Sequence, residues 1–231
     1  EPAVSHVSFE AKPGETTAII GSTGSGKTAL VGLIPRFYDV QEGEVLVDGV
    51  NVKDYDRRTL RRKIGYVPQK ALLFKGTIME NIRFGDDSAS DERVKEAAAI
   101  AQSTDFIEDK PDGFDSSISQ GGSNVSGGQR QRLAIARAIV RKPEIYVFDD
   151  SFSALDFKTD SALRQALSKE TGNATVVIVA QRVSTIMNAD RIIVMDEGKV
   201  MGIGTHRELL NTCGTYQEIV RSQLSEEEMS A

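Results

Sequence analysis

Short runs of apolar, largely β-branched residues recur along the chain, separated by longer stretches with helical periodicity. The runs cover residues 17–20, 145–148, 175–179 and 192–195. Each run is apolar throughout and does not alternate with polar residues, which is typical of parallel strands buried on both faces. The pattern therefore predicts an α/β fold, with a parallel sheet and flanking helices.

Two other segments, residues 43–47 and 199–203, alternate in hydrophobicity and are flanked by glycines. This pattern favours short antiparallel strands, and we expect both segments to form a β edge. The tail, residues 225–231, contains three consecutive glutamates, and we expect it to be a frayed end without a function.

Residues 77–141 are mostly helical in pattern. Within them, a helical run covers residues 91–100, and an alanine- and arginine-rich run covers residues 129–140. We therefore expect a helical subdomain at 77–141, inserted between two segments of the core, residues 1–76 and 142–231.

The composition is that of a globular protein, with 39% hydrophobic and 27% charged residues in a chain of 231. We interpret residues 1–231 as one domain with a sizeable insertion. The formal net charge of -6 argues against a nucleic-acid partner, and the basic run at 57–63 is interpreted as solvated surface. A single cysteine, Cys213, fits a reducing cytoplasm. No apolar run approaches the roughly 18 residues that cross a bilayer. Because the chain starts abruptly at Glu1, we expect membrane segments upstream on a longer polypeptide.

A glycine-rich motif, GSTGSGKT, follows the first apolar run and fully matches the phosphate-binding pattern G-x-x-x-x-G-K-[ST]. Its residues are Gly21, Ser22, Thr23, Gly24, Ser25, Gly26, Lys27 and Thr28. The glycines let backbone N–H groups approach phosphates, Lys27 supplies positive charge, and the Thr28 hydroxyl can meet Mg²⁺. The alternative is a glycine-rich turn with an accidental lysine, but the full pattern between a strand and a helix favours ATP.

A second magnesium ligand is expected at the end of another apolar strand. Asp149 ends the run IYVFD at 145–149, where a phosphate-binding loop needs a carboxylate. A buried strand that ends in an acidic residue is common, so the presence of the glycine-rich motif makes this interpretation specific.

Further motifs make the chain resemble the ATP-binding cassette (ABC) ATPases over nearly its whole length. They are NVSGGQRQ at 124–131, YVPQ at 66–69, IYVFDD at 145–150 and SALD at 153–156, and the segment 67–85 is similar to exporters. The resemblance implies a P-loop NTPase core with an antiparallel β edge and an inserted α-helical subdomain, and it implies ATP and Mg²⁺ as ligands. It also implies a transmembrane domain on the same polypeptide, with the present domain at the cytoplasmic face of the cell membrane.

The signature segment consists of Ser126, Gly127, Gly128 and Gln129, and its first three residues precede the predicted arginine-rich helix. Free N–H groups and the positive end of a helix dipole favour an anion there. In the family this anion is the γ-phosphate of ATP held by a second nucleotide-binding domain, so the two domains pair head to tail. The resemblance further places Gln69 near Mg²⁺ and the attacking water, and it makes Thr28, Gln69 and Asp149 the metal-site residues.

The chain departs from the family in its catalytic residues. Asp150 stands where a glutamate normally polarises the attacking water, and Gln181 replaces the histidine that contacts the γ-phosphate. Aspartate is shorter by one methylene, about 1.5 Å of reach, and glutamine cannot become cationic. Residues 116–122 also resemble the exporter loop only loosely. Losing both groups resembles the degenerate half of a heterodimeric exporter.

Two readings remain open from the sequence. The first is an ATP-hydrolysing motor for export, with Asp150, Gln181 and Gln69 as catalytic residues and low activity in its own site. The second is a non-hydrolytic, nucleotide-gated clamp that supports its partner's site.

Overall fold

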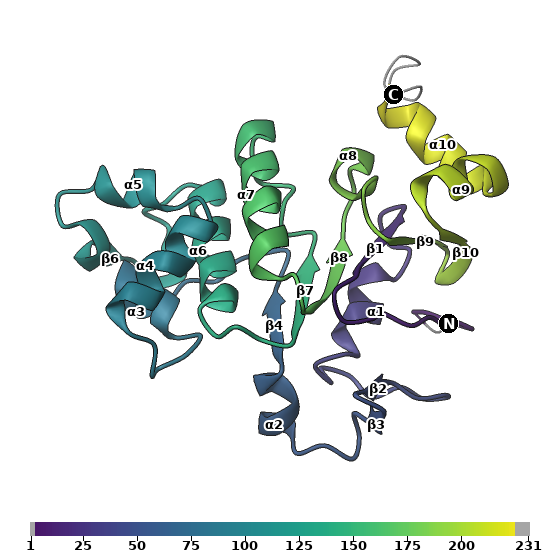
Figure 1. Cartoon of the computed structure of the whole chain (residues 1–231), viewed down its shortest axis with the longest axis horizontal. Helices are drawn as coiled ribbons and strands as arrows, with labels where there is room; N and C mark the ends of the chain where they lie inside the picture. Colours follow the sequence, from purple (N-terminus) through teal and green to yellow (C-terminus); the bar gives the residue numbers. More distant parts are fainter. Residues whose placement is uncertain (1–2, 225–231) are drawn as a thin grey trace.

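A six-stranded sheet forms the centre of the protein in the computed structural model, which describes residues 3–224 (Figure 1). The tail at 225–231 lies outside the described residues. The strands, in the spatial order β10-β9-β1-β8-β7-β4, are β1 (Thr16–Gly21), β4 (Ile64–Val67), β7 (Ile145–Asp149), β8 (Thr175–Val179), β9 (Arg191–Asp196) and β10 (Lys199–Gly204). All neighbouring strands are parallel except β9 and β10. The predicted α/β fold with a mainly parallel sheet is confirmed.

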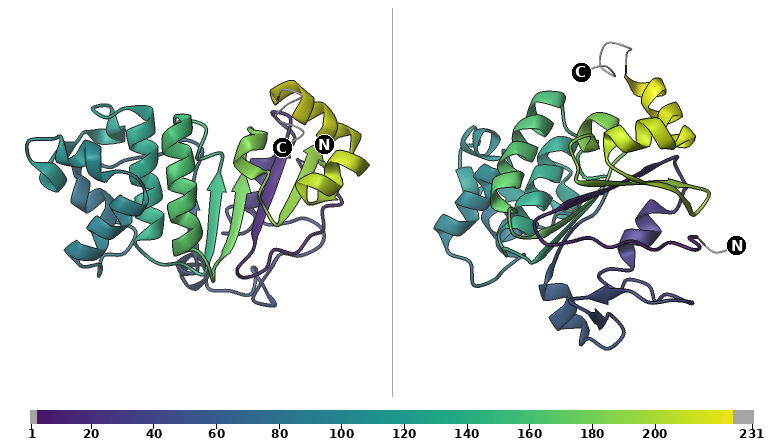
Figure 2. Two further views of the ribbon diagram at one scale, coloured as in Figure 1. Left: turned by 45° about the horizontal axis from the view of Figure 1, so that its top comes forward. Right: turned by 45° about the vertical axis from the view of Figure 1, so that its right-hand side comes forward.

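Both faces of the sheet are buried, as the unbroken apolar runs predict. Ala18 and Ile20 of β1 pack in one hydrophobic cluster, whereas Ile19 between them packs in a second cluster. The helices α7 (Phe157–Glu170) and α8 (Val183–Ile186) lie on one side of the sheet, and α1 (Lys27–Gly32) lies on the other (Figure 2). Because β1, β4, β7 and β8 are parallel, the loops that follow them meet at one edge of the sheet.

Antiparallel strands are confirmed at both glycine-flanked segments, but only one of them lies at the edge of the main sheet. Strand β10 pairs with β9 at the sheet's edge. The run at 43–47 instead contributes β2 (Leu46–Val47), which pairs with β3 (Val50–Asn51) in a separate ribbon. Asp48 and Gly49, which both have positive φ angles, form the tight turn that joins β2 to β3.

The basic run lies on α2 (Arg57–Arg62) and at its end. Its four arginines are exposed, as expected for solvated surface, and Lys63 is half-buried. Arg61 donates to the carbonyl of Pro35 and lies over the ring of Phe37. Lys63 pairs with Asp48 and Glu144. Both cations therefore join neighbouring elements.

A helical group lies between β4 and β7 in the sequence and beside the sheet in space (Figure 1). Its elements are β5 (Gly76–Thr77), α3 (Ile78–Arg83), α4 (Asp91–Ile100), α5 (Thr104–Glu108), η1 (Gly113–Asp115), β6 (Ser117–Ile118), η2 (Gln120–Gly122) and α6 (Gly127–Ile139). Arg93 of α4 ties this group to the core, because its guanidinium donates to Glu170 at the end of α7. The same guanidinium donates to the carbonyl of Ile139 in α6, within the group. Two further helices, α9 (His206–Thr212) and α10 (Gly214–Gln223), follow β10.

Candidate nucleotide-binding site

The loop between β1 and α1 depends on its glycines. Gly24 and Gly26 have φ angles of +84° and +91°, in the left-handed region that favours glycine. A Cβ atom at Gly26 would lie 2.5 Å from the carbonyl oxygen of Ala3, and one at Gly21 would lie 2.0 Å from that of Met195. The loop backbone is therefore tightly wrapped, which is the shape that lets N–H groups converge on a phosphate.

Lys27 lies within this loop, at the start of α1. Its ammonium donates to the carbonyl oxygens of Gly21 at 2.8 Å and Ser22 at 2.7 Å, and to the hydroxyl of Ser25 at 3.3 Å. Burial lowers the pKa of Lys27, and the nearby carboxylate of Asp150 opposes this shift. The loop therefore holds a desolvated positive charge, the kind of group that interacts strongly with phosphate.

Asp149 ends β7 and is 2% exposed. Its Oδ1 accepts a hydrogen bond from the Thr28 hydroxyl at 3.0 Å, although the two residues lie 121 positions apart. Its Oδ2 accepts one from the Tyr66 hydroxyl, also at 3.0 Å. Burial raises the pKa of Tyr66, and the Asp149 carboxylate raises it further, so this hydroxyl remains a donor.

A hydroxyl and a carboxylate side by side are hard oxygen ligands of the type that Mg²⁺ takes together with substrate phosphates. No group of three His, Cys, Asp or Glu side chains within residues 3–224 is arranged to hold a metal ion alone. The donor set at Thr28 and Asp149 thus fits an ion that completes its shell with phosphate and water oxygens.

The side chains of Asp150, Gln69 and Gln181 meet at one point, although they come from three different loops. Asp150 Oδ2 accepts from Gln69 Nε2 at 2.9 Å and from Gln181 Nε2 at 2.6 Å. The backbone of Asp150 has a φ of +48°, which is uncommon for a residue other than glycine. Burial raises the pKa of Asp150, and the hydrogen bonds from the two glutamines oppose this shift.

The signature segment begins α6, and it differs from the expectation that both glycines precede the helix. Ser126 is the N-cap, and Gly127 and Gly128 are the first two helical residues. The Ser126 hydroxyl accepts from the N–H of Gln129, whose side chain accepts from the N–H of Ser126. This capping box starts the helix two residues earlier than the apolar pattern indicates.

The first two N–H groups of α6 have no partner inside the helix. A Cβ atom at Gly127 would meet nothing within 4 Å, so this end is open. Within residues 3–224 no hydrogen bond joins Ser126–Gln129 to the loop at 21–28. The segment is instead next to 153–156, since a Cβ atom at Gly128 would lie 3.3 Å from the carbonyl oxygen of Ala154.

Tyr66 is a site residue that sequence reasoning missed. It lies in β4, which was not predicted as a strand, and β4 pairs with β7 so that Tyr66 is opposite Val147. A shallow cavity of about 340 Å³ lies beside the Thr28–Asp149 pair and is lined partly by Tyr38, Tyr66 and Gln69. The sequence carries no spacing signal for Tyr66, because its partner Asp149 lies 83 positions later in the chain.

The fold and the geometry of this loop define a P-loop NTPase core. The family model described as "ABC transporter" matches residues 4–153. The chain belongs to the ABC transporter family.

The proteins similar to this chain include a flippase and an exporter. The chain is 49% identical over 225 residues to an uncharacterized ABC transporter ATP-binding protein of Mycobacterium tuberculosis, covering 96% of this chain and 38% of that protein. It is 42% identical over 223 residues to an ATP-dependent lipid A-core flippase of Desulfotalea psychrophila, covering 96% and 39%. A solved bacterial Atm1-family ABC exporter with ATP bound matches with a TM-score of 0.94 and 38% identity, over 97% of this chain and 40% of that chain. This chain thus spans 38–40% of the length of these proteins. Within residues 3–224, no helix combines the length and apolar character needed to cross a membrane.

Proposed function

We propose that this chain is the motor domain of an ABC exporter, which binds and hydrolyses ATP and thereby drives transport across a membrane. The contact between Thr28 and Asp149 beside the glycine-rich loop carries the proposal. It joins the end of the phosphate-binding loop to the end of a second strand, where Mg²⁺ and a triphosphate need ligands from both.

The loop and the residues beside it have distinct roles in this proposal. The backbone N–H groups of residues 21–28 bind the phosphates, and Lys27 neutralises the β- and γ-phosphates. Thr28 and Asp149 hold Mg²⁺, and Gln69 reaches the ion from the loop after β4. When bound, Mg²⁺ neutralises charge on the transferring phosphoryl group.

Asp150 is the residue placed to orient the attacking water and accept its proton. Two features limit it. Its carboxylate is short by one methylene, and its Oδ2 already accepts from both Gln69 and Gln181. Because a misplacement of about 1 Å can cost on the order of 100-fold in rate, we propose that hydrolysis in this chain's own site is slow. Gln181 contacts the γ-phosphate as a neutral donor.

We further propose that the chain works in a head-to-tail pair with a different nucleotide-binding chain. The open N–H groups of Gly127 and Gly128 would bind the γ-phosphate in the partner's site, and the partner would supply the competent catalytic residues. Residues 77–141 act as the helical subdomain that carries this segment, and 1–76 with 142–231 act as the core. The similarity to a flippase and to a solved exporter supports a transmembrane domain on the same polypeptide, with this domain at the cytoplasmic face.

The alternative function is a non-hydrolytic clamp, which the double engagement of Asp150 favours. Single-turnover hydrolysis in the assembled pair, with each site disabled in turn, separates the two functions. Phosphate release from this chain's site supports the motor, and its complete absence supports the clamp.

Replacing Lys27 with Ala tests the proposed site directly. The variant should lose measurable binding of Mg-ATP in calorimetry, because the main positive charge in the loop disappears. Lys95→Ala is the control, since Lys95 is exposed on α4 and away from the loop. Unchanged affinity in Lys27→Ala would exclude the assignment of this loop as the ATP site.

A further inference from the structure

The side-chain amide of Gln223, the last residue of α10, holds the loop that carries Gln181. Gln223 Nε2 donates to the carbonyl oxygen of Gln181 at 2.8 Å, and Gln223 Oε1 accepts from the N–H of Val183 at 2.8 Å. One amide group therefore binds the backbone on both sides of Arg182. The two residues that it joins to α10 lie 42 and 40 positions earlier in the chain.

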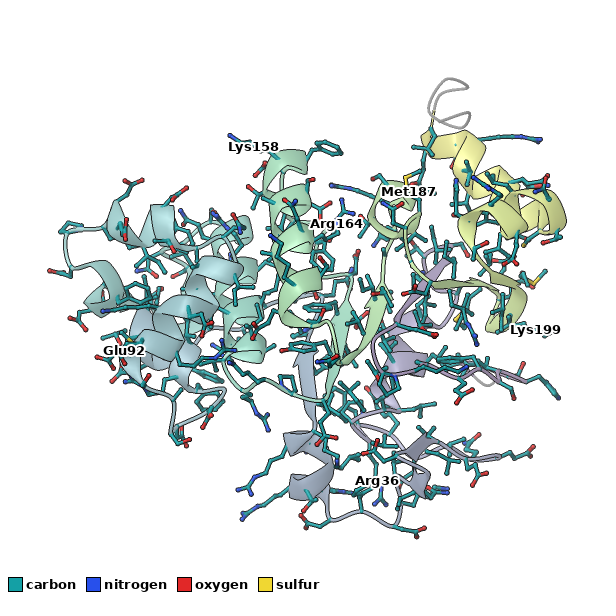
Figure 3. The ribbon with its side chains drawn as sticks, viewed as in Figure 1. Arg36, Glu92, Lys158, Arg164, Met187 and Lys199 are labelled. Carbon is teal, nitrogen blue, oxygen red and sulfur yellow. The ribbon has the colours of Figure 1, made fainter. Side chains whose placement is uncertain are left out.

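The Gln223 side-chain amide supplies a capping hydrogen bond for α8 that the loop at residues 181–183 does not provide itself. Arg182 is the N-cap of α8, and its side chain makes no capping hydrogen bond. The N–H of Val183 is the first of the helix and has no partner inside it, so Gln223 acts as its cap from another helix. A second contact reaches α8 from α7, which carries Arg164 (Figure 3). The Arg164 side chain donates to the carbonyl oxygen of Ser184 at 3.3 Å.

The position of helix α10, which carries Gln223, is fixed by packing and by a hydrogen bond to α9. Its residues Tyr216 and Val220 are completely buried, and the Tyr216 hydroxyl hydrogen-bonds His206 Nδ1 of α9 at 2.8 Å. The position of Gln223 is thus set by packing that does not involve the nucleotide loop. Displacing the backbone of Gln181 would displace its side chain from Asp150, whose Oδ2 it reaches at 2.6 Å.

We propose that Gln223 is a positioning residue that aims Gln181 at the γ-phosphate, so that α10 sets this chain's preference for ATP over ADP. The inference rests on the proposed function, in which Gln181 contacts the γ-phosphate. ADP lacks that group, so the ratio of the two affinities isolates the Gln181 contact from all contacts to the α- and β-phosphates.

The test measures dissociation constants of Mg-ATP and Mg-ADP for the purified chain by calorimetry. A hydrogen bond to a charged group is commonly worth about tenfold or more in affinity, so Gln181→Ala should lower the ATP-to-ADP preference by about tenfold. Gln223→Ala should lower it about threefold or more while leaving the Mg-ADP affinity unchanged. In the Gln181→Ala background, Gln223→Ala should change the preference by less than about 1.5-fold, because the side chain being positioned is already gone.

The matched control lies on the same helix. Gln217 also donates its side-chain amide to a backbone carbonyl, that of Leu210, but it does not touch the Gln181 loop. Gln217→Ala should leave the preference unchanged. Hydrogen exchange of the Val183 amide tests its bond to Gln223 directly. This exchange should become faster in Gln223→Ala and not in Gln217→Ala.

An unchanged ATP-to-ADP preference in Gln223→Ala would overturn the proposal, as would an equal loss with and without Gln181 or unaltered exchange at Val183. Failure of the proposed function looks different, because Lys27→Ala would then bind both nucleotides like the wild-type chain. Because Gln223 is exposed, loss of folding in the alanine variant is not expected, and a thermal melt verifies this.

Discussion

Gly127→Asp separates the role of the signature segment from the folding of the chain. Gly127 is the first residue of α6, and a Cβ atom there would meet nothing within 4 Å. A carboxylate at the start of a helix is favoured by the helix dipole by about 0.3–1 kcal/mol. The variant should therefore melt at or above the wild-type temperature, and any loss of activity must come from the ligand that approaches this end.

The expected loss is large, because the new carboxylate stands where the γ-phosphate of the partner's ATP has to approach. Two charges about 4 Å apart repel by about 4 kcal/mol at an effective dielectric constant near 20. Preorganised donors of this kind commonly contribute on the order of 100- to 1000-fold in rate, and a displaced phosphate no longer reaches them. We expect turnover below about 1% of wild type.

The assay is the steady-state ATPase rate of the assembled transporter at saturating ATP. Gly214→Asp is the control, since Gly214 is the first residue of α10 and a Cβ atom there also meets nothing within 4 Å. It introduces the same charge at an equivalent helix position and should leave turnover unchanged. Gly127→Asp with more than about a third of wild-type turnover would refute the reasoning, and so would an equal loss in Gly214→Asp.

Two further predictions concern Tyr66 and His206. Tyr66→Phe removes the donor to Asp149 Oδ2. The Mg²⁺ concentration for half-maximal ATP binding should therefore rise several-fold, while ATP binding without metal stays the same. The control is Tyr55→Phe, which loses a hydroxyl bonded to the Val47 carbonyl instead. Burial lowers the pKa of His206, so the folded state binds protons less readily and stability should fall as pH drops below about 6.5. Melting temperatures between pH 7 and 5 should show a smaller decline in His206→Gln than in wild type or His6→Gln, and equal declines in all three would contradict this.

The sequence predicted the strands where local pattern determines them. The run at 175–179 is β8 to the residue, because an unbroken β-branched stretch buried on both faces has no competing structure. Strand β4 was missed. It has only four residues, including Gly65 and Tyr66, and it becomes a strand because it pairs with β7, some 80 residues later in the chain. Gly65 interrupts its apolar run, so no unbroken β-branched stretch marks it as a strand.

The residues of the candidate site also fall into those that a local motif identifies and those that only the structure reveals. The match at residues 21–28 identified the loop because its function requires fixed spacing within eight residues. The bond of Asp149 to Tyr66 joins two strands, and that of Gln223 to Gln181 joins a helix to a loop, in each case far apart in the chain. Ordinary tyrosines and glutamines in such elements carry no spacing signal. Only the three-dimensional arrangement indicates that they act on the site.

The edge of the sheet where the parallel strands begin carries none of the residues that we propose to bind phosphate or Mg²⁺. There the elements are joined by backbone bonds, such as the N–H of Gly14 to the carbonyl of Ala174 and the N–H of Thr175 to that of Glu144, and by side-chain bonds such as that of Lys63 to Glu144. Gly172 and Asn173 are exposed in the turn before β8. A fluorophore or short epitope inserted between them would be a strand's length away from Asp150 and Gln181. Nucleotide-driven motion could then be followed with a probe attached at 172–173 that leaves every phosphate-facing group unmodified.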